Sequence, residues 1–270
     1  MVTGLATAIA AGPAQPQESA PVIIADGQVM MPADEKAPEF RTWRDGFSLA
    51  IGAGVLVEPD YEGSSDFTFL PIPYVSLQYR DWFELDPTGA SVRLSKWNGF
   101  ALEGQVGYDL GRDEDDADIL RGLGNIDFGV TVAGRASYEI GPLEAFASLQ
   151  RIIGGSDGLI GEIGAELSQP VTEALILSVE ASASFADDAY MDAYFSVNSL
   201  QSARSGLRTF DAGAGLKRID LSAAALYSFN EHWFVRGEAG IGLLTGDAAD
   251  SPIVDSDFQP SASLFIGYRF

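Results

Sequence analysis

The chain has 270 residues, of which 46% are hydrophobic and 11% aromatic, and it contains no cysteine, which excludes thiolate chemistry and cysteine-ligated metal sites. Sixteen Lys and Arg residues stand against 39 Asp and Glu, so the formal charge of -23 argues against a DNA or RNA partner, whose phosphates it would repel. No apolar run approaches the roughly 18 residues that a membrane-spanning helix needs, which excludes a helical membrane protein.

The first 42 residues show no regular periodicity. Residues 1–11 are small and apolar and contain an Ala8-x-Ala10 pattern typical of a secretory cleavage site, but the basic start of a signal is missing. We interpret this stretch as a truncated signal peptide, and a flexible end is the alternative. Residues 12–42 are rich in Pro, Ala and acidic side chains, which predicts a flexible periplasmic linker before a single domain at 43–270.

From Trp43 onward, apolar side chains recur at every second position, which is the period of a β-strand. A Pro-broken strand is expected at 67–79, a short pair at 82–87 and 90–97, and a last strand before the C-terminus. Together with the eight strands listed next, this makes twelve predicted strands, and an even number returns both chain ends to the periplasm. The other predicted strands are 47–58, 100–110, 126–140, 143–151, 159–168, 173–185, 216–229 and 233–245.

The connections between these strands alternate in length, which predicts an orientation because periplasmic turns are short and external loops are long. Short turns are expected at 80–81, 97–99, 141–142, 169–173 and 230–231. Long or acidic connections are expected at 59–66, 111–125, 186–212 and 246–257. This arrangement places all four tryptophans at the periplasmic rim as part of an aromatic girdle: Trp43, Trp82, Trp97 and Trp233.

The alternating pattern also fits a soluble β-sandwich or barrel, but the placement of charge favours a membrane. One face of 100–110, 126–140, 219–229 and 233–243 carries no charge, whereas a soluble barrel would be polar outside and apolar within. We therefore predict an all-β fold, a transmembrane antiparallel up-and-down β-barrel of about 12 strands in the outer membrane of a Gram-negative bacterium. Its expected surroundings are membrane lipid and lipopolysaccharide, and a last strand with Tyr268 and Phe270 closes it.

The polar face of the predicted strands is expected to line the lumen of the barrel. Acidic side chains outnumber basic ones on this face, so an open lumen would favour cations, whereas charges that pair across the lumen would close it. The loop 186–212 is the expected plug. The predicted lumen residues are Glu58, Glu103, Asp109, Asp127, Arg135, Glu139, Glu162, Glu166, Glu180, Arg218, Arg236 and Glu238.

Catalytic and cofactor chemistry find little support in the sequence. The only histidine, His232, falls in a predicted periplasmic turn without the partners of a catalytic triad, so we expect no enzyme activity and no cofactor. The acidic run 113–118 lacks the ligand spacing of a calcium loop, which predicts a hydrated loop rather than a dedicated metal site. Loose bridging by Ca²⁺ or Mg²⁺ to lipopolysaccharide phosphates is a hypothesis for this run.

Several motifs resemble those of the MipA/OmpV family. The stretch Glu58-Pro59-Asp60-Tyr61-Glu62-Gly63-Ser64 is similar to its P-x-Y-x-G-S loop, and 107–124 is similar to its GR...LxGLG segment. Residues 190–197 resemble its Y-M-x-x-Y-F-G-V box with Ser196 in place of Gly, and 246–254 resemble its GDAADSPIV loop. The motif residues singled out are Pro59, Tyr61, Gly63, Ser64, Tyr190, Tyr194, Phe195, Asp250, Ser251 and Pro252.

The resemblance implies an outer-membrane barrel that serves as a scaffold joining a murein transglycosylase to a penicillin-binding protein, while other members resemble porins or adhesion-related surface proteins. The sequence therefore leaves two alternative functions. The first is a structural barrel that binds peptidoglycan-remodelling enzymes through its periplasmic turns and the linker 12–42. The alternative is a small cation-preferring porin for small solutes.

Overall fold

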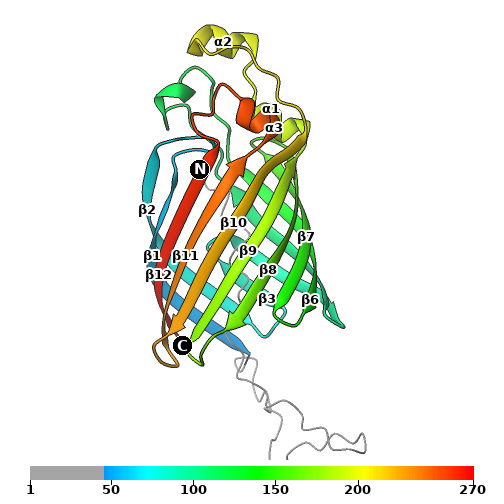
Figure 1. Ribbon diagram of the computed structural model, residues 1–270, viewed down its shortest axis with the longest axis vertical. Coiled ribbons are helices and arrows are strands. Elements are labelled where there is room, and N and C mark those ends of the chain that lie inside the picture. The colour runs from blue at the N-terminus through cyan, green and yellow to red at the C-terminus, as the bar shows by residue number, and fades with distance from the viewer. Residues whose placement is uncertain (1–45) are drawn as a thin grey trace, which may run out of the picture.

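The computed structural model describes residues 46–270, so the expected signal peptide, the linker and Trp43 lie outside the described residues. Twelve strands form one closed barrel in which each strand is antiparallel to both of its neighbours (Figure 1), and the predicted fold class is confirmed. The strands are β1 (Phe47–Pro59), β2 (Phe67–Tyr79), β3 (Phe83–Asp86), β4 (Gly89–Trp97), β5 (Phe100–Asp109), β6 (Gly129–Ile140), β7 (Leu143–Gly154), β8 (Leu159–Pro170), β9 (Leu175–Ala186), β10 (Gly215–Ser228), β11 (Trp233–Leu244) and β12 (Phe258–Arg269).

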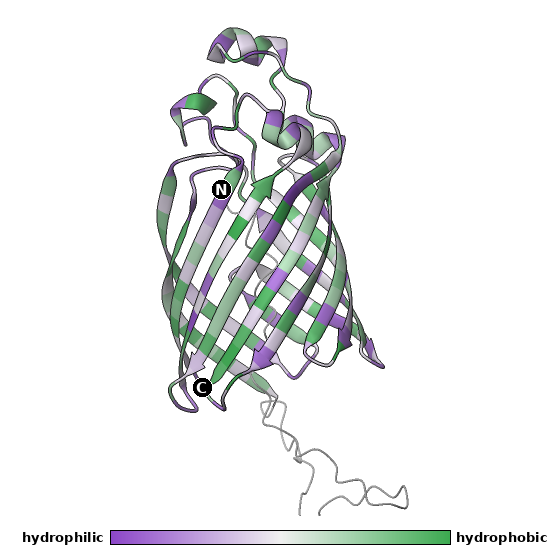
Figure 2. Ribbon diagram, viewed as in Figure 1, coloured by the Kyte–Doolittle hydropathy of each residue, from purple (hydrophilic) through white to green (hydrophobic). Residues whose placement is uncertain are grey.

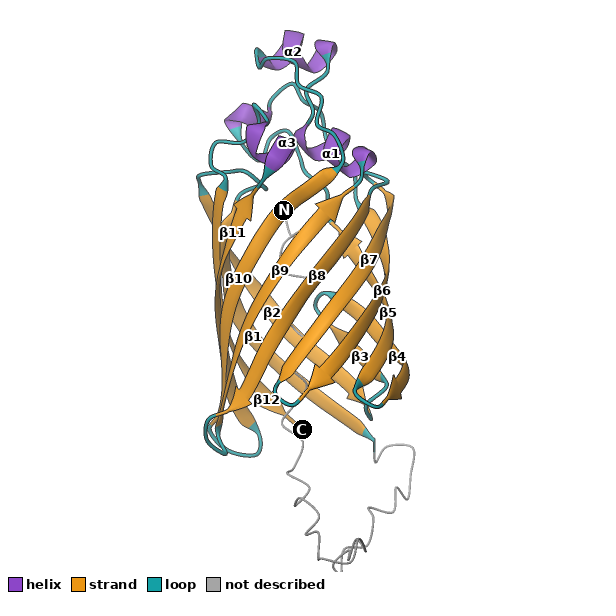
Figure 3. Ribbon diagram, turned by 45° about the vertical axis from the view of Figure 1, so that its right-hand side comes forward, coloured by secondary structure: helices purple, strands orange, loops and turns teal. Residues whose placement is uncertain are grey.

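The helices all lie in long connections at one end of the barrel, which we call the loop end, and the short turns after β2, β4, β6, β8 and β10 lie at the other, the turn end (Figure 3). They are α1 (Asp188–Phe195), α2 (Ser199–Ser205) and α3 (Gly246–Asp250), with a 3₁₀ turn at Asp118–Leu120. Within residues 46–270, none of these helices is long and apolar enough to cross a membrane.

The alternating sequence pattern produces two different surfaces on the barrel wall. In β6, Val130 and Val132 are 42% and 45% exposed on the outside, whereas Thr131 and Arg135 on the inside are 6% and 4% exposed. Figure 2 shows the resulting alternation of hydrophobic and polar residues along the strands. Side chains on a strand point to opposite faces, so a period of two places the apolar set outside and the polar set in the lumen.

The last strand closes the barrel against the first. Tyr268 of β12 pairs with Ile51 of β1, and the backbone N–H of Phe270 donates to the carbonyl of Leu49 at 2.9 Å. Aromatic side chains surround the turn end, where Trp82, Trp97 and Trp233 are between 45% and 70% exposed. Other exposed aromatic side chains near this end are Phe47, Phe100, Tyr138, Tyr227, Phe229 and Phe270.

One strand begins later than expected, and this changes the place of a predicted lumen residue. Strand β6 starts at Gly129 rather than at 126, so Asp127 precedes the strand and is exposed. The ladder with β7 ends at the pair Gly129 and Gly154, because Gly154 and Gly155 adopt positive φ values and turn the chain away. The expectation that Asp127 lines the lumen on a strand is therefore wrong.

Candidate functional site

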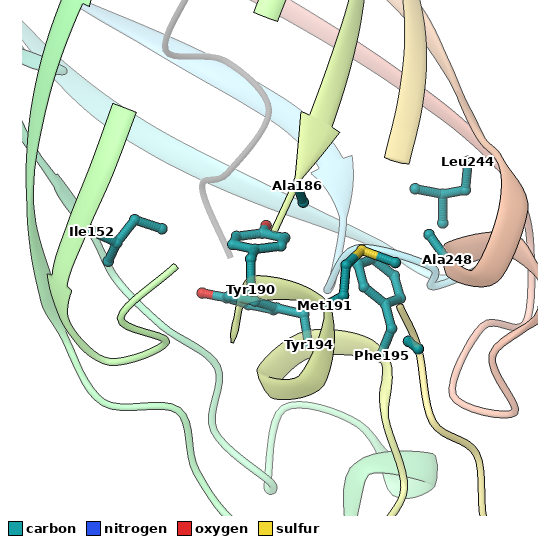
Figure 4. Packing of buried hydrophobic residues seen from close by; sticks show 9 residues of the cluster. Ile152, Ala186, Tyr190, Met191, Tyr194, Phe195, Leu244 and Ala248 are labelled. Carbon is teal, nitrogen blue, oxygen red and sulfur yellow. The ribbon is translucent and has the colours of Figure 1, made fainter. Parts of the chain in front are cut away.

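The loop end of the barrel is filled by four loops, 60–66, 110–128, 187–214 and 245–257, which together we call the cap. Its main cluster surrounds helix α1 (Figure 4), and a second cluster joins all four of these loops. The buried residues of the two clusters are Ile152, Ala186, Tyr190, Met191, Tyr194, Phe195, Ala212, Leu244 and Ala248, and Tyr61, Leu120, Leu123, Val197 and Ile253.

Helix α1 supplies the centre of the cap. Its N-cap residue Asp187 accepts a hydrogen bond from the backbone N–H of Tyr190 at 3.0 Å, which satisfies one of the free donors at a helix start. Tyr190, Met191, Tyr194 and Phe195 lie three or four positions apart and so share one face, which is buried. The rings of Tyr190 and Tyr194 stack with centroids 4.5 Å apart. The predicted plug loop thus packs into the loop end.

A buried ion pair ties the first loop of the cap to the barrel wall. The Lys217 ammonium lies 2.7 Å from a carboxylate oxygen of Glu62, and the two side chains are 3% and 5% exposed. The Tyr190 hydroxyl donates to the other oxygen of Glu62 at 3.1 Å. Burial raises the pKa of Glu62, but Lys217, Arg218 and these hydrogen bonds lower it further, so its pKa lies below the ordinary value. Burial and the neighbouring Glu62 carboxylate raise the pKa of Tyr190 well above its usual range.

A second polar contact joins α1 to strand β5. The Tyr194 hydroxyl donates to the carboxylate of Asp109 at 2.9 Å, and the Arg112 guanidinium donates to the backbone carbonyl of Tyr194 at 2.9 Å. Arg112 also lies 5.9 Å from the centre of the Tyr194 ring. Burial and the Asp109 carboxylate raise the pKa of Tyr194, which keeps its hydroxyl protonated as a donor.

The family motifs meet in the cap although they lie far apart in the sequence. The Tyr61 hydroxyl donates to the carbonyl of Ile253 at 2.9 Å, and the Ser251 hydroxyl donates to the carbonyl of Phe195 at 2.6 Å. Gly63 has a φ of 108°, and a Cβ there would approach a methyl group of Val254 to 2.6 Å, so this position favours glycine. Ser64 is buried, Pro59 ends β1, Asp250 ends α3, and Pro252 is half-buried beside them.

Apart from Asp127, the predicted lumen residues lie in strands at inward-facing positions, and their role in selectivity remains a prediction. Four arginines of the lumen wall bond carboxylates two residues away or on the adjacent strand, so these charges pair along the wall rather than across the lumen. These pairs are Arg93 with Glu103 at 3.0 Å, Arg135 with Glu144 at 2.8 Å, Arg218 with Asp220 at 2.6 Å, and Arg236 with Glu238 at 3.1 Å.

Space remains in the lumen below the cap. A cavity of about 130 Å³ lies against β3, β4, β5 and the inward faces of β6 and β7. Its charged lining residues are Asp81, Glu84, Asp86, Arg93, Glu103 and Arg135. This volume holds a few water molecules, since one water occupies roughly 30 Å³ in the liquid.

Several residues that hold the cap together were not singled out from the sequence. Lys217 falls on the outward side of a strict two-residue period, but the register of β10 shifts between Leu216 and Arg218, and this irregularity turns Lys217 inward. Glu62 sits inside a motif whose neighbours were named, and Arg112 lies in the GR segment. For Glu62 and Arg112, only their place in these motifs indicated a structural role.

The acidic loop and the histidine have ordinary surroundings. A Glu114 oxygen accepts the backbone N–H groups of Gly122 and Gly124, each at 3.0 Å, so this carboxylate orders its own loop. The ring of His232 lies 5.2 Å from that of Tyr268 at the turn end. Within the described residues, no group of three or more His, Asp or Glu is arranged to hold a metal ion.

Comparisons with known proteins identify relatives of this chain. Residues 51–270 match the family model of the MltA-interacting protein MipA. The putative outer membrane protein YiaT of Escherichia coli K12 is 25% identical over 229 residues, which cover 82% of this chain and 91% of YiaT. The MltA-interacting protein of Escherichia coli K12 is 35% identical over 77 residues, which cover 28% of this chain and 31% of that protein.

The solved structures that match this chain include two proteins of bacterial outer membranes. OmpT of Vibrio cholerae is 8% identical, and the match covers 83% of this chain and 97% of OmpT with a TM-score of 0.39. An outer membrane channel from Pseudomonas putida F1 is 13% identical, and the match covers 89% of this chain and all of the channel with a TM-score of 0.44.

The localisation follows from the barrel and from these relatives. The closed all-antiparallel barrel has an apolar outer surface, and the relative YiaT is named a putative outer membrane protein, so the chain resides in the outer membrane of Gram-negative bacteria. The family model spans 51–270, which is most of the chain and almost all of its described part. The chain belongs to the MipA family of outer-membrane barrel proteins.

Proposed function

We propose that this barrel is a scaffold that holds a peptidoglycan-remodelling enzyme at the periplasmic face of the outer membrane. The partner class is a murein transglycosylase, with a penicillin-binding protein joined through it. The observation that carries the proposal is the cap, because it fills the loop end with packed aromatic side chains and a buried ion pair 2.7 Å apart. A barrel closed at one end offers its surfaces to partners rather than its lumen to solutes.

The geometry of the turn end supports a partner on that side. Its connections are short, so the strand ends form a compact surface whose shape varies little. The name of one relative, MltA-interacting protein, states an interaction of that protein, which is 35% identical to this chain over 77 residues. The proposal assigns no catalytic step to this chain.

Binding of the purified full chain to an immobilised MltA-type transglycosylase tests the proposal. Deletion of 12–42 or the turn variant Glu231→Arg should weaken retention of the chain. The matched control is Asp115→Arg, which makes the same charge change at an exposed position of the cap and should leave retention unchanged. The absence of binding by the full chain, or sensitivity to Asp115→Arg alone, would contradict scaffolding.

The lumen wall supports one other function, a small cation-preferring pore. Carboxylates outnumber arginines around the cavity, and such a wall attracts cations when water fills it. Steady cation-selective conductance from the intact chain would make transport the leading function. The cap favours scaffolding over this alternative.

A further inference from the structure

One strand of the barrel leaves part of its neighbour unpaired. Strand β3 has four residues and pairs with β2 only at Leu77, Gln78 and Tyr79. Among the described strands, residues 67–76 of β2 therefore have a neighbour on one side only, namely β1. At about 3.3 Å per residue this edge is about 30 Å long. Figure 3 shows the β3–β4 turn partway up the barrel, below the loop end.

The interruption has a defined boundary, and we call it the wall window. Its floor is the β3–β4 turn at 87–88, where the Tyr108 hydroxyl donates to the carbonyl of Pro87 at 2.5 Å. One side is the β2 edge, 67–76, and the other is the end of β5 at 108–109. The roof is the cap cluster in which Tyr61 packs with Leu120 and Leu123.

The backbone of the window edge is adapted to hydrocarbon. The Leu49 carbonyl of β1 accepts from Phe270 of β12, so the odd residues of β1 direct their backbone groups to β12 and the even ones to β2. Pro71 and Pro73 lie opposite Val55 and Ala53, both odd, so the two proline nitrogens face the window. Because proline has no N–H, the middle of the edge presents no unsatisfied donor to lipid.

The two prolines also argue against a second β-strand as the occupant of the window. A strand added to this edge needs N–H donors on alternate residues of β2, and two consecutive donor positions are missing. At its middle the edge offers only the carbonyl oxygens of Pro71 and Pro73, and without the N–H donors these do not form a strand ladder. Acyl chains of the surrounding bilayer lie against such an edge without pairing with it.

The inward face of β2 behind the window carries three large apolar or aromatic side chains, and a polar cavity with Glu84, Arg236 and Arg269 begins beside the last of them, Tyr74. Leu70, Ile72 and Tyr74 of β2 point inward, because they alternate with the outward-facing Phe69, which is 71% exposed, and with the two exposed prolines. Leu56 of β1, the partner of Leu70, is itself 1% exposed and packs behind Leu70. The Tyr74 ring then lies 5.8 Å from Phe265 and 6.0 Å from Phe234.

A polar cavity lies at the level of the window floor, and Gln78 is the residue of β2 that lines it. The cavity of about 130 Å³ is lined by the floor residue Thr88, by Asp86 and Glu84 of β3, and by Arg93 and Glu103, which pair at 3.0 Å. Its carboxylates outnumber its arginines, so it disfavours an anionic group. An apolar surface next to a polar, acidic cavity matches a molecule with one hydrocarbon tail and an uncharged, zwitterionic or cationic head.

We propose that the wall window admits a single-chain amphiphile from the outer membrane into the lumen, with its tail along Leu70, Ile72 and Tyr74 and its head toward the cavity. The inference depends on residence in the membrane and not on the scaffolding function. It requires no opening of the cap, because entry is through the side of the barrel.

Single-cysteine variants test this proposal, since the chain has no cysteine of its own. Ile72→Cys is labelled with bimane and the protein is refolded into vesicles of phosphatidylcholine that contain doxyl-labelled phosphatidylcholine. Val75→Cys, on the outer face of the same strand, is the fully lipid-exposed reference. Gln150→Cys, on the inward face of β7, is the lumen control for the tail, because it lines the cavity proposed for the head group and not the surface proposed for the doxyl-labelled tail. Heat-modifiable migration verifies folding of each variant, and Leu70→Cys replaces Ile72→Cys if that variant misfolds.

The expected result is quenching at Ile72 that exceeds quenching at Gln150 by about threefold or more, because doxyl groups stay in hydrocarbon unless the wall is open. A spin-labelled lysophosphatidylcholine should quench Ile72 more than a spin-labelled stearate does at pH 8. Equal and low quenching at Ile72 and Gln150 would overturn the window. Stronger quenching by stearate would overturn the assignment of the head group.

Discussion

Glu62 shows how a single side chain holds two distant parts of the barrel. Its side chain is buried, accepts from both Lys217 and Tyr190, and lies 155 residues before Lys217 in the chain. A buried carboxylate is stable only while its partners remain, because the protein interior replaces little of the hydration energy that the charge loses on burial. The pair therefore controls whether the cap stays packed.

Removal of one partner should be costly. Lys217→Met leaves the Glu62 carboxylate buried without its closest cation, and we expect a loss of about 3–5 kcal/mol in the free energy of unfolding. Urea titration of the refolded protein in micelles measures it. The control Lys96→Met breaks a pair with Glu139 whose side chains are 45% and 44% exposed, and should cost about 1 kcal/mol or less. The double variant Lys217→Met/Glu62→Gln should recover part of the loss. Equal costs for the two single variants would contradict the role of the pair.

The same residue predicts a dependence on pH. The pKa of Glu62 is lowered in the folded state, so its contribution is present above the unfolded pKa of about 4.3 and is lost as the pH falls through the folded value. The stability advantage of the native chain over Glu62→Gln should therefore be constant from pH 7 to about pH 5 and decline in stronger acid. Urea midpoints of both proteins at each pH measure it. An advantage that grows toward acid would contradict the sign.

At the scale of elements, β2 combines two roles. One of its edges pairs with β1 along its whole length, while the other edge has pairing partners at three residues only. Prolines are tolerated in strands where the N–H side has no partner, so Pro71 and Pro73 mark the open side in the sequence itself. The short length of β3 and the two prolines of β2 therefore belong to one structural feature, the unpaired edge of β2.

Restoring the missing donors should destabilise this edge. Pro71→Val/Pro73→Val keeps the side chains apolar but adds two N–H groups that face hydrocarbon, and we expect a cost of about 1–3 kcal/mol for each donor. The double variant should also dimerise more readily in detergent, because an unpaired edge with donors accepts another strand. Urea unfolding in lipid bilayers and crosslinking measure the two effects. The control Ala53→Val changes an outward side chain next to Pro73 without adding a donor. Unchanged stability of the double variant would show that the edge is covered.

The strands were predictable and the cap was not, for a physical reason. A strand in a barrel obeys a local rule, since each residue faces either lipid or lumen, and this rule gave β1, β5 and β10 to within two residues. The cap depends on contacts between residues far apart in the chain, such as Tyr61 with Ile253, which no local period encodes. The two-residue period predicts the wrong face for Lys217, because the shift of register in β10 turns its side chain toward the lumen.

At the scale of the whole molecule, a barrel of twelve strands is wider than the eight-strand size that side chains fill completely. Side chains close small barrels, whereas this barrel pairs its charges along the wall and closes its loop end with loops. The closure should therefore be separable from the barrel. Removing part of the cap should leave the strands intact and expose an acidic lumen.

Replacement of residues 188–213 by a short Gly-Ser linker is the corresponding experiment. The intact chain should be silent in planar bilayers, because the cap blocks the loop end. The shortened chain should give steady channels that prefer cations in a salt gradient, since carboxylates outnumber arginines on the lumen wall. Neutralising Glu103 and Glu162 in the shortened chain should reduce this preference, whereas Asp115→Asn in the remaining cap should not.

The reversal potential of these channels distinguishes the two ways in which the barrel can be closed. If helix α1 and its loop are the barrier, conductance appears when they are removed and its selectivity follows the lumen charges. If the shortened chain stays silent while its strands remain folded, the barrier lies deeper in the lumen and the cap serves stability alone. Conductance by the intact chain would contradict closure by the cap and would favour transport over scaffolding.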